Sequence, residues 1–271
     1  MASIGPTQLA LLTSATPEPE REAESLGTSS IVVRRLYAPQ AGLTDRALGG
    51  PSLLASRWPQ LAELDLSGNE LTQLPAGIGQ LSGLRKLYLQ NCRLTSLPED
   101  LVGAGCCVDL REIWLEHNRL TSLPVDWSGA RRLVSLHCGW NQLTCFPVDF
   151  CTSLPRLVEL LATNNALRAL PQTLGPGMPQ LRCLAVRANQ LTALPASLGD
   201  APQLTRLLAG ANPLDGDLRS FPLALSLCPM GELYISGCGL TAVPTCLRGY
   251  ANTLRWVDMS DNSAQTTFRR A

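Results

Sequence analysis

Residues 110–124 read LREIWLEHNRLTSLP, and this stretch decides the fold. Leucine or isoleucine stands at positions 110, 113, 115, 120 and 123, with a proline at 124. The same stretch places an acid, a histidine and an asparagine side by side, as Glu116, His117 and Asn118. These three residues could form a reactive cluster, or they could belong to a repeated pattern that needs them for its shape.

The pattern LxxLxLxxN recurs along the chain. Nine copies, at steps of 23 to 26 residues, start at Leu61, Leu84, Leu110, Leu133, Leu157, Leu181, Leu204, Met230 and Leu254. A degraded tenth copy, VRRLYAPQA, precedes them at residues 33–41. A fixed period of this length is typical of solenoids, in which each repeat is one unit that stacks on its neighbours.

Each copy contains the alternation of a short strand. The fourth and sixth positions are apolar, and the fifth position between them is variable, so the two kinds of side chain face opposite ways. One such strand cannot bury its apolar face alone, but copies stacked about 4.8 Å apart make a parallel sheet over one leucine core. We therefore predict an α/β-type repeat solenoid with a parallel sheet of about ten short strands, spanning on the order of 45 Å.

The ninth position is expected to hold the turn after each strand. A buried side-chain amide can satisfy backbone groups that a bend leaves open, and stacked amides would form a ladder. Cysteine takes the same place at Cys92 and Cys238. The predicted structural ladder consists of Asn69, Asn118, Asn141, Asn165, Asn189, Asn212 and Asn262.

A second signature, such as LTQLP at 71–75 and LTALP at 191–195, follows most copies. Proline interrupts both sheet and helix, so these segments should be mostly irregular or 3-10 in conformation. Apolar residues at matching offsets should close the core from the convex side, namely Ile78, Leu101, Trp127, Phe150, Leu174, Leu198 and Leu247.

Both signatures resemble the leucine-rich repeat family, over roughly residues 33–262. The LxxLPxxL half resembles the intracellular group related to Ras-pathway and cell-polarity scaffolds, and is also similar to the typical repeats of some extracellular proteins. The resemblance implies a right-handed solenoid curved into a horseshoe, with the strands lining its concave face. It also implies that another protein binds on that face.

The repeats divide the chain into three parts. Residues 1–30 contain the Pro/Glu-rich segment TPEPEREAES and are expected to be a disordered tail. The repeat domain covers residues 31–262, with an irregular N-terminal cap at 31–60 and regular repeats at 61–262. Residues 263–271 form a C-terminal tail and a weak cap, so a contact with another molecule could cover the last repeat.

Composition limits the partners. Lys and Arg together number 22, as do Asp and Glu, which argues against nucleic acid because phosphate binding needs a concentrated positive field. No run of about 18 apolar residues is present, so we expect no membrane insertion. The 10 cysteines are scattered, and the N-terminus lacks the features of a signal peptide, so a cytoplasmic location fits best.

Catalytic signatures are missing from the sequence. His117 and His137 are the two histidines, and neither belongs to a common catalytic or metal-binding motif. We predict no enzyme activity, no cofactor and no metal.

A candidate protein-binding patch lies at the positions expected to point out of the concave face. Tyr88, Trp114 and His137 occupy the fifth position of consecutive repeats, and Trp140 flanks them at an eighth position. Binding hot spots favour aromatic residues with a polar rim, here Glu112, Glu116 and His117. Alternatively, these aromatic residues tile the sheet and stabilise cross-strand pairs.

The sequence thus predicts a non-catalytic protein-binding scaffold or adaptor. Three alternatives stay open: a structural subunit of a large cytoskeletal or ribonucleoprotein assembly, an extracellular recognition domain, and the targeting arm of an enzyme complex.

Overall fold

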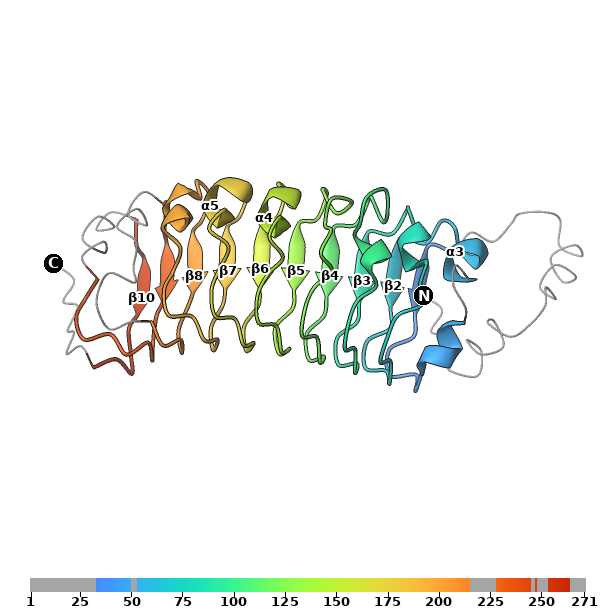
Figure 1. The fold of residues 1–271 in the computed structure, drawn as a ribbon, viewed down its shortest axis with the longest axis horizontal. Helices are drawn as coiled ribbons and strands as arrows, with labels where there is room; N and C mark the ends of the chain where they lie inside the picture. Colours follow the sequence, from blue (N-terminus) through green and yellow to red (C-terminus); the bar gives the residue numbers. More distant parts are fainter. Residues whose placement is uncertain (1–32, 50–52, 215–227, 245–246, 248–252, 264–271) are drawn as a thin grey trace, which may run out of the picture.

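The computed structural model describes residues 33–49, 53–214, 228–244, 247 and 253–263. The predicted tail at 1–30 and most of the predicted C-terminal tail lie outside these residues. Within them, each repeat forms one coil, and the coils stand side by side in chain order (Figure 1).

Every repeat contributes one strand of three residues to a single parallel sheet. The strands pair in the order of the chain, each with the next. Their bounds are β1 Arg35–Tyr37, β2 Glu63–Asp65, β3 Lys86–Tyr88, β4 Glu112–Trp114, β5 Ser135–His137, β6 Glu159–Leu161, β7 Cys183–Ala185, β8 Arg206–Leu208, β9 Glu232–Tyr234 and β10 Trp256–Asp258. The sheet confirms the predicted fold class.

Register follows the repeat without a slip. Leu87 lies opposite Leu64 on one side and Ile113 on the other, so residues at the same repeat position always stand next to each other. The first, fourth and sixth positions point inward, and Leu110, Ile113 and Leu115 are all fully buried. One continuous core therefore runs the length of the stack.

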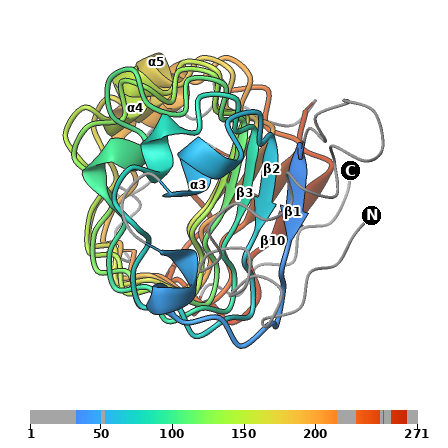
Figure 2. The same cartoon turned by 90° about the vertical axis from the view of Figure 1, so that its right-hand side faces the viewer.

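The opposite side of several coils holds short helical segments. These are the 3-10 helices η1 Asp45–Leu48, η2 Ile78–Gln80, η3 Glu99–Leu101 and η4 Ala196–Asp200, and the short α-helices α3 Leu53–Arg57, α4 Phe150–Ser153 and α5 Leu174–Gly177. Viewed along the stack, the sheet forms one side and these segments cover the other (Figure 2). The seven apolar residues expected to close the core from this side are buried.

Two repeats are longer than their neighbours and carry insertions, one around residues 102–110 and one at 212–225. In the first, Cys107 is buried and its N–H donates to the Gly79 carbonyl of the previous coil at 3.0 Å. The next coil packs tightly on it, because a Cβ added to Gly129 would lie 2.0 Å from the Gly103 oxygen. Most of the second insertion, 212–225, lies outside the described residues.

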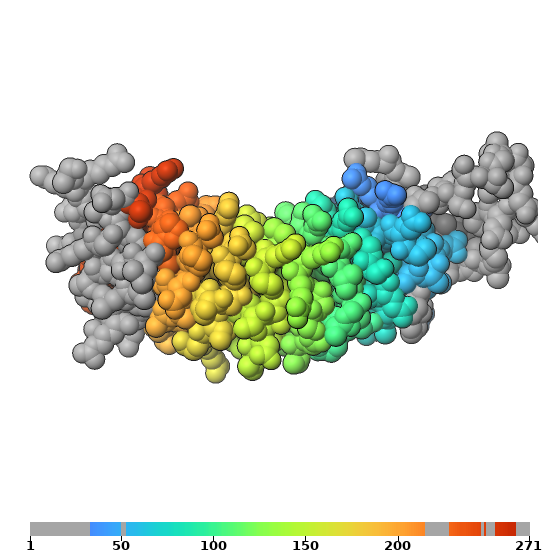
Figure 3. All heavy atoms as spheres, turned by 90° about the horizontal axis from the view of Figure 1, so that it is seen from above, coloured from blue at the N-terminus to red at the C-terminus, as the bar shows by residue number. Residues whose placement is uncertain are grey.

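The whole row of coils is bent. Seen from above, one long side is hollowed between the two ends (Figure 3). Among the described residues, no helix has the length and apolar character needed to cross a membrane.

Candidate functional site

The aromatic residues of the candidate patch come together in the middle of the sheet. Tyr88 lies opposite Trp114 in register, and Trp114 lies opposite His137. The ring centroids of Tyr88 and Trp114 are 5.7 Å apart, and those of Trp114 and His137 are 4.3 Å apart. These distances are typical of attractive aromatic pairs, so β3, β4 and β5 present one contiguous cluster.

The side chain of His137 was expected to be exposed on the concave face, but it is buried. It occupies an outward position, but only 8% of the residue is exposed. The indole of Trp114 lies against its ring with a tilt of 38°, and the side chains of Glu116 and Ser135 are bonded to its two nitrogens. His137 therefore supports the patch from beneath, and a partner would contact the residues around it.

The contacts of His137 fit a charged imidazolium. Its Nδ1 lies 3.1 Å from Glu116 Oε1, and its Nε2 lies 2.8 Å from Ser135 Oγ. Ser135 Oγ donates to Glu159 Oε2 at 3.1 Å, so it is left to accept from Nε2. With an acceptor at each ring nitrogen, both nitrogens can carry a proton.

Electrostatics support this protonation state. Burial lowers the pKa of His137, but hydrogen bonds and charges from Glu116 and Glu159 outweigh burial, so the net pKa is raised. The positive ring then faces the indole of Trp114, an arrangement that favours a cation.

Ser135, His137 and Glu116 also follow the order of a nucleophile, a base and an acid. Two observations argue against acyl transfer by this group. The hydroxyl of Ser135 donates its proton to Glu159 and not to His137. The Ser135 N–H donates to the Arg111 carbonyl at 3.0 Å, so this N–H is not available to stabilise an oxyanion. The cluster is better suited to fixing side chains on the sheet surface.

Trp140 and His117 form a second aromatic pair, at the edge of the patch. Their rings stack with centroids 5.1 Å apart and 16° between the planes. His117 is exposed, and 53% of Trp140 is exposed. A partner approaching the concave face would meet this pair directly.

Both residues have left-handed backbone conformations, with φ of 57° at His117 and 55° at Trp140. The eighth position has a positive φ in all ten repeats. Glycine or asparagine suits this conformation, and several repeats carry such residues there, including Gly68, Asn91 and Asn164. This compositional signal could have predicted the turn, but the sequence reasoning above missed it.

Glu112 belongs to a row of alternating charges at the third repeat position. Lys86 Nζ lies 3.0 Å from Glu112 Oε1, and this hydrogen bond is the main cause of the raised pKa of Lys86. The same position pairs Arg35 with Glu63 and Arg206 with Glu232. Glu112 is therefore already bonded within the chain and contributes mainly to the rim of the patch.

Three buried polar atoms in or beside the patch lack hydrogen-bond partners within the described residues. They are Gln90 Oε1, Trp114 Nε1 and Glu116 Oε2, and Ser197 Oγ elsewhere is the fourth such atom. Unsatisfied buried polar groups are costly, and their concentration here marks the patch as unusual within the fold.

Below the patch, the ninth-position asparagines hold the turns. In Asn118 the side-chain oxygen accepts from the Leu94 N–H at 3.0 Å, and the side-chain nitrogen donates to the Leu89 and Leu115 carbonyls at 2.8 and 2.9 Å. Asn69, Asn141, Asn165, Asn189, Asn212 and Asn262 make equivalent bonds. Asn118 thus faces inward, away from Glu116 and His117.

Metal or thiol chemistry finds little support in the described part of the chain. It contains no group of three or more potential metal ligands. Burial raises the pKa of Cys138 to about 12 and that of Cys151 to about 11, so these thiols stay protonated and unreactive.

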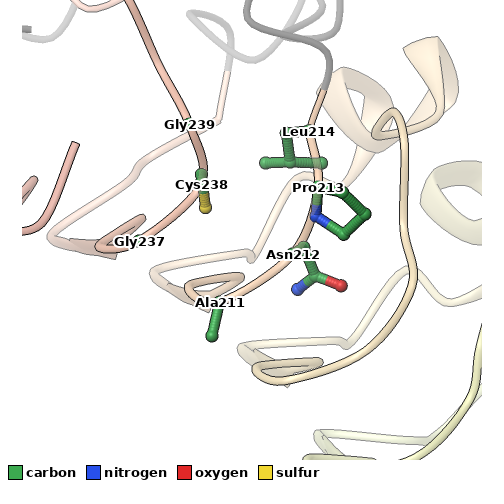
Figure 4. Close-up of a pocket in the computed structure, with 7 residues that line it drawn as sticks. All are labelled: Ala211, Asn212, Pro213, Leu214, Gly237, Cys238 and Gly239. Atoms are coloured by element: carbon green, nitrogen blue, oxygen red, sulfur yellow. The ribbon is translucent and has the colours of Figure 1, made fainter. Parts of the chain in front are cut away.

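A hollow between the eighth and ninth repeats also offers no reactive group (Figure 4). Its lining includes Asn212 and Cys238, whose polar atoms bond to backbone carbonyls of the chain. No charged side chain lines it.

Comparison with family models identifies the repeat. A model described as "Leucine Rich Repeat" matches residues 60–81, and one described as "Leucine Rich repeats (2 copies)" matches residues 82–129. No sequence among curated proteins matches the chain.

Several solved structures share the fold. The Leptospira interrogans LRR protein LIC12759 is 26% identical, with 85% of this chain and 67% of that one covered and a TM-score of 0.63. The LRR ectodomain of the plant membrane receptor kinase GASSHO1/SCHENGEN3 from Arabidopsis thaliana is also 26% identical, over 86% of this chain, with a TM-score of 0.71. The plant peptide hormone receptor RGFR1 is 23% identical over 85% of this chain, with a TM-score of 0.64.

This chain spans 28% of the first plant receptor and 40% of the second, so their likeness concerns the repeats. Residues 60–129 match the leucine-rich repeat models, and the ten parallel strands and the structural neighbours show that the described residues form a leucine-rich repeat solenoid.

Proposed function

We propose that the chain is a non-catalytic scaffold or adaptor that binds another protein through the patch on its concave face. The observation that carries this proposal is Trp140. A large apolar side chain is exposed there, on a left-handed backbone that disfavours it, next to the Trp114 and His137 cluster. Residues held in costly conformations tend to gather at binding sites.

The rigid sheet suits this role. Trp114, His137 and Glu116 are held by ring contacts and hydrogen bonds before any partner arrives. A preformed surface limits the side-chain entropy lost on binding, which favours affinity.

The structural neighbours support protein or peptide binding in general. GASSHO1/SCHENGEN3 was solved in complex with CASPARIAN STRIP INTEGRITY FACTOR 2, and RGFR1 in complex with RGF2. Those ligands belong to those receptors, and the support they give this chain is the use of the same fold for binding.

We further propose a cytoplasmic location and the intracellular LxxLPxxL type of repeat. All nine cysteines of the described residues are free, in keeping with a reducing compartment. The likeness to receptor ectodomains favours the alternative of an extracellular recognition domain. Thiol titration of the native protein separates the two, because free thiols favour the cytoplasm and disulfides would favour the extracellular reading.

A structural subunit of a larger assembly is the second candidate. In the last repeat Leu254, Val257 and Met259 are only partly buried, whereas Leu110, Ile113 and Leu115 at the same positions are fully buried. A neighbour that caps this end would complete the burial. Sedimentation tests this candidate, since a stable soluble monomer favours the adaptor and insolubility of the isolated chain favours the subunit.

Affinity capture from native lysate tests the main proposal. Trp140→Ala, alone and combined with Trp114→Ala, should abolish capture of partners that the unaltered chain retains. Trp256→Ala is the matched control, because 58% of Trp256 is exposed on β10, outside the patch. The proposal fails if the Trp140 and Trp256 variants capture the same proteins equally well while their melting temperatures are unchanged.

A further inference from the structure

The second repeat position forms a row of side chains where the strands begin. The Arg85 N–H donates to the Ala62 carbonyl, the Arg111 N–H to that of Arg85, and the Val134 N–H to that of Arg111, each at 2.8 Å. These bonds continue from coil to coil, so the second-position side chains stand next to each other about 4.8 Å apart. We call this set the strand-start row, and it consists of Arg34, Ala62, Arg85, Arg111, Val134, Val158 and Arg182.

The arginines of this row are exposed and have no carboxylate partner. Within the described residues, no ion pair or side-chain hydrogen bond involves the guanidinium of Arg34, Arg85, Arg111 or Arg182. Arginine stays charged at all ordinary pH values, so each adds a full positive charge to the row.

Nearby acidic groups are already occupied. On the adjacent third position, Glu63 pairs with Arg35, Glu112 pairs with Lys86, and Glu159 accepts from Ser135. The positive charge of the row is therefore not neutralised by its nearest carboxylates. Two more exposed arginines, Arg131 and Arg156, lie in the segments that precede the neighbouring strands β5 and β6.

Two apolar residues, Val134 and Val158, interrupt the row of charged side chains. Val134 is 38% exposed and Val158 is partly buried, and both lie between Arg111 and Arg182. At the other end, a hollow over Ala62 is bordered by Arg34 and Arg85. Along the row, basic side chains up to Arg111 are therefore followed by the apolar Val134 and Val158 and then by the basic Arg182.

We propose that the strand-start row binds an extended acidic segment of a partner protein, with an apolar residue of that segment over Val134 and Val158. Guanidinium groups bind carboxylates through two parallel hydrogen bonds, which suits aspartate and glutamate side chains. Three strand spacings separate Arg111 from Arg182, roughly 14 Å, which about four residues of extended chain would span. Acidic residues on both sides of an apolar one would therefore match the row.

Nucleic acid fits the same surface less well. The chain has a formal net charge of +0, and the two valines break the positive surface where a phosphate backbone would need charge. This row borders the rim of the concave patch at Glu112 but shares no residue with it, so the inference does not depend on the proposed function.

Fluorescence anisotropy with the full chain tests the inference. The probe is a labelled peptide of sequence EESLSEE, compared with QQSLSQQ, with EESSSEE and with an oligothymidylate of similar length. Measurements at about 50 mM salt keep screening of the charges low.

The test variant combines Arg85→Gln with Arg111→Gln. Its matched control combines Arg119→Gln with Arg168→Gln, which removes the same charge from exposed arginines beyond the ends of the strands. We expect the test variant to weaken EESLSEE binding about tenfold and to reduce its salt dependence, because two exposed ion pairs are lost. The control should stay within about twofold, since those side chains lie outside the row.

A separate variant tests the apolar part of the row. Val134→Ser should remove the preference for EESLSEE over EESSSEE while leaving the preference over QQSLSQQ, because it changes no charge.

Several results would overturn the inference. They are no binding of EESLSEE, equal weakening in the test and control variants, and a Val134→Ser variant that keeps its preference for leucine. Tighter binding of the oligothymidylate, lost in the same Arg85 and Arg111 variant, would make the row a nucleic-acid surface instead.

Discussion

Trp140 carries a large apolar side chain at a left-handed turn where the other repeats have glycine, alanine or a polar residue. Its side chain is more than half exposed, and its backbone lies in the left-handed region. A left-handed backbone costs free energy for any residue with a Cβ. The exposed side chain contributes little stability to the free protein apart from its stacking on His117.

Replacing Trp140 by glycine should therefore give a more stable protein than replacing it by alanine. We expect a difference of about 1 kcal/mol in the free energy of unfolding, because glycine adopts positive φ without a steric penalty. Urea denaturation of the two variants measures it. An alanine variant as stable as the glycine variant would show that this turn is not strained.

His137 predicts a pH dependence of stability. Its pKa in the folded protein is raised above the ordinary value of 6.5, so folding stabilises the protonated form. The contribution is fully present below about pH 6.5 and is lost as the pH rises through the raised folded-state pKa.

Thermal melts across that window should show the unaltered chain losing more stability with rising pH than a His137→Gln variant. The variant keeps a polar group at the site but does not titrate. Parallel pH profiles for the two proteins would contradict the account of a charged imidazolium between Glu116 and Glu159.

Among single residues, the sequence indicates where a side chain points but not how much of it is covered. Repeat spacing places His137 on the outward side, next to Trp114. Its burial depends on the rotamers of Glu116 and Trp114 from the preceding repeat and of Ser135 from its own strand, which no repeat position specifies.

At the scale of the strand and its turn, the pattern is far more informative. Because a register shift of one residue would expose the leucines, the spacing of Leu61, Leu84 and Leu110 is enough to align the strands. The left-handed turn before the ninth position could also have been predicted, because residues such as Gly68 and Asn91 favour that backbone conformation. The spacing of the apolar residues alone does not reveal it.

Cys92 shows what the ninth-position asparagine contributes. The Cys92 thiol donates to the Leu66 carbonyl at 3.4 Å. In the next repeat the side-chain oxygen of Asn118 accepts from the Leu94 N–H, but Cys92 has no such oxygen for the equivalent N–H of Leu71. Cys92→Asn should stabilise the chain by about 1 kcal/mol, because the added amide supplies that acceptor.

The reverse change, Asn118→Cys, should destabilise the chain by at least as much, since buried backbone groups lose their partners. Chemical denaturation of both variants gives the comparison. Destabilisation by Cys92→Asn would mean that this turn lacks room for the amide.

For the whole molecule, stability should depend on position in the stack. A repeat in the middle packs between two neighbours, whereas an end repeat packs against one. Val257 and Met259 in the last repeat are only partly buried, so β10 should open more readily than β4 to β7.

Hydrogen exchange measured by mass spectrometry should show that gradient, with the slowest exchange in the middle strands. Uniform protection through β10 would indicate that the last repeat is capped as firmly as the others.

The molecule as a whole presents a rigid sheet whose aromatic patch we propose as the contact for a partner protein. Site-specific photocrosslinking tests this claim most directly, with a crosslinking amino acid placed at Trp140 or, as a control, at Val148 on a different surface, where 89% of the residue is exposed. In native lysate the probe at position 140 should form a defined adduct with a partner, and the probe at position 148 should not. An adduct that forms at position 148 and not at position 140 would contradict the account.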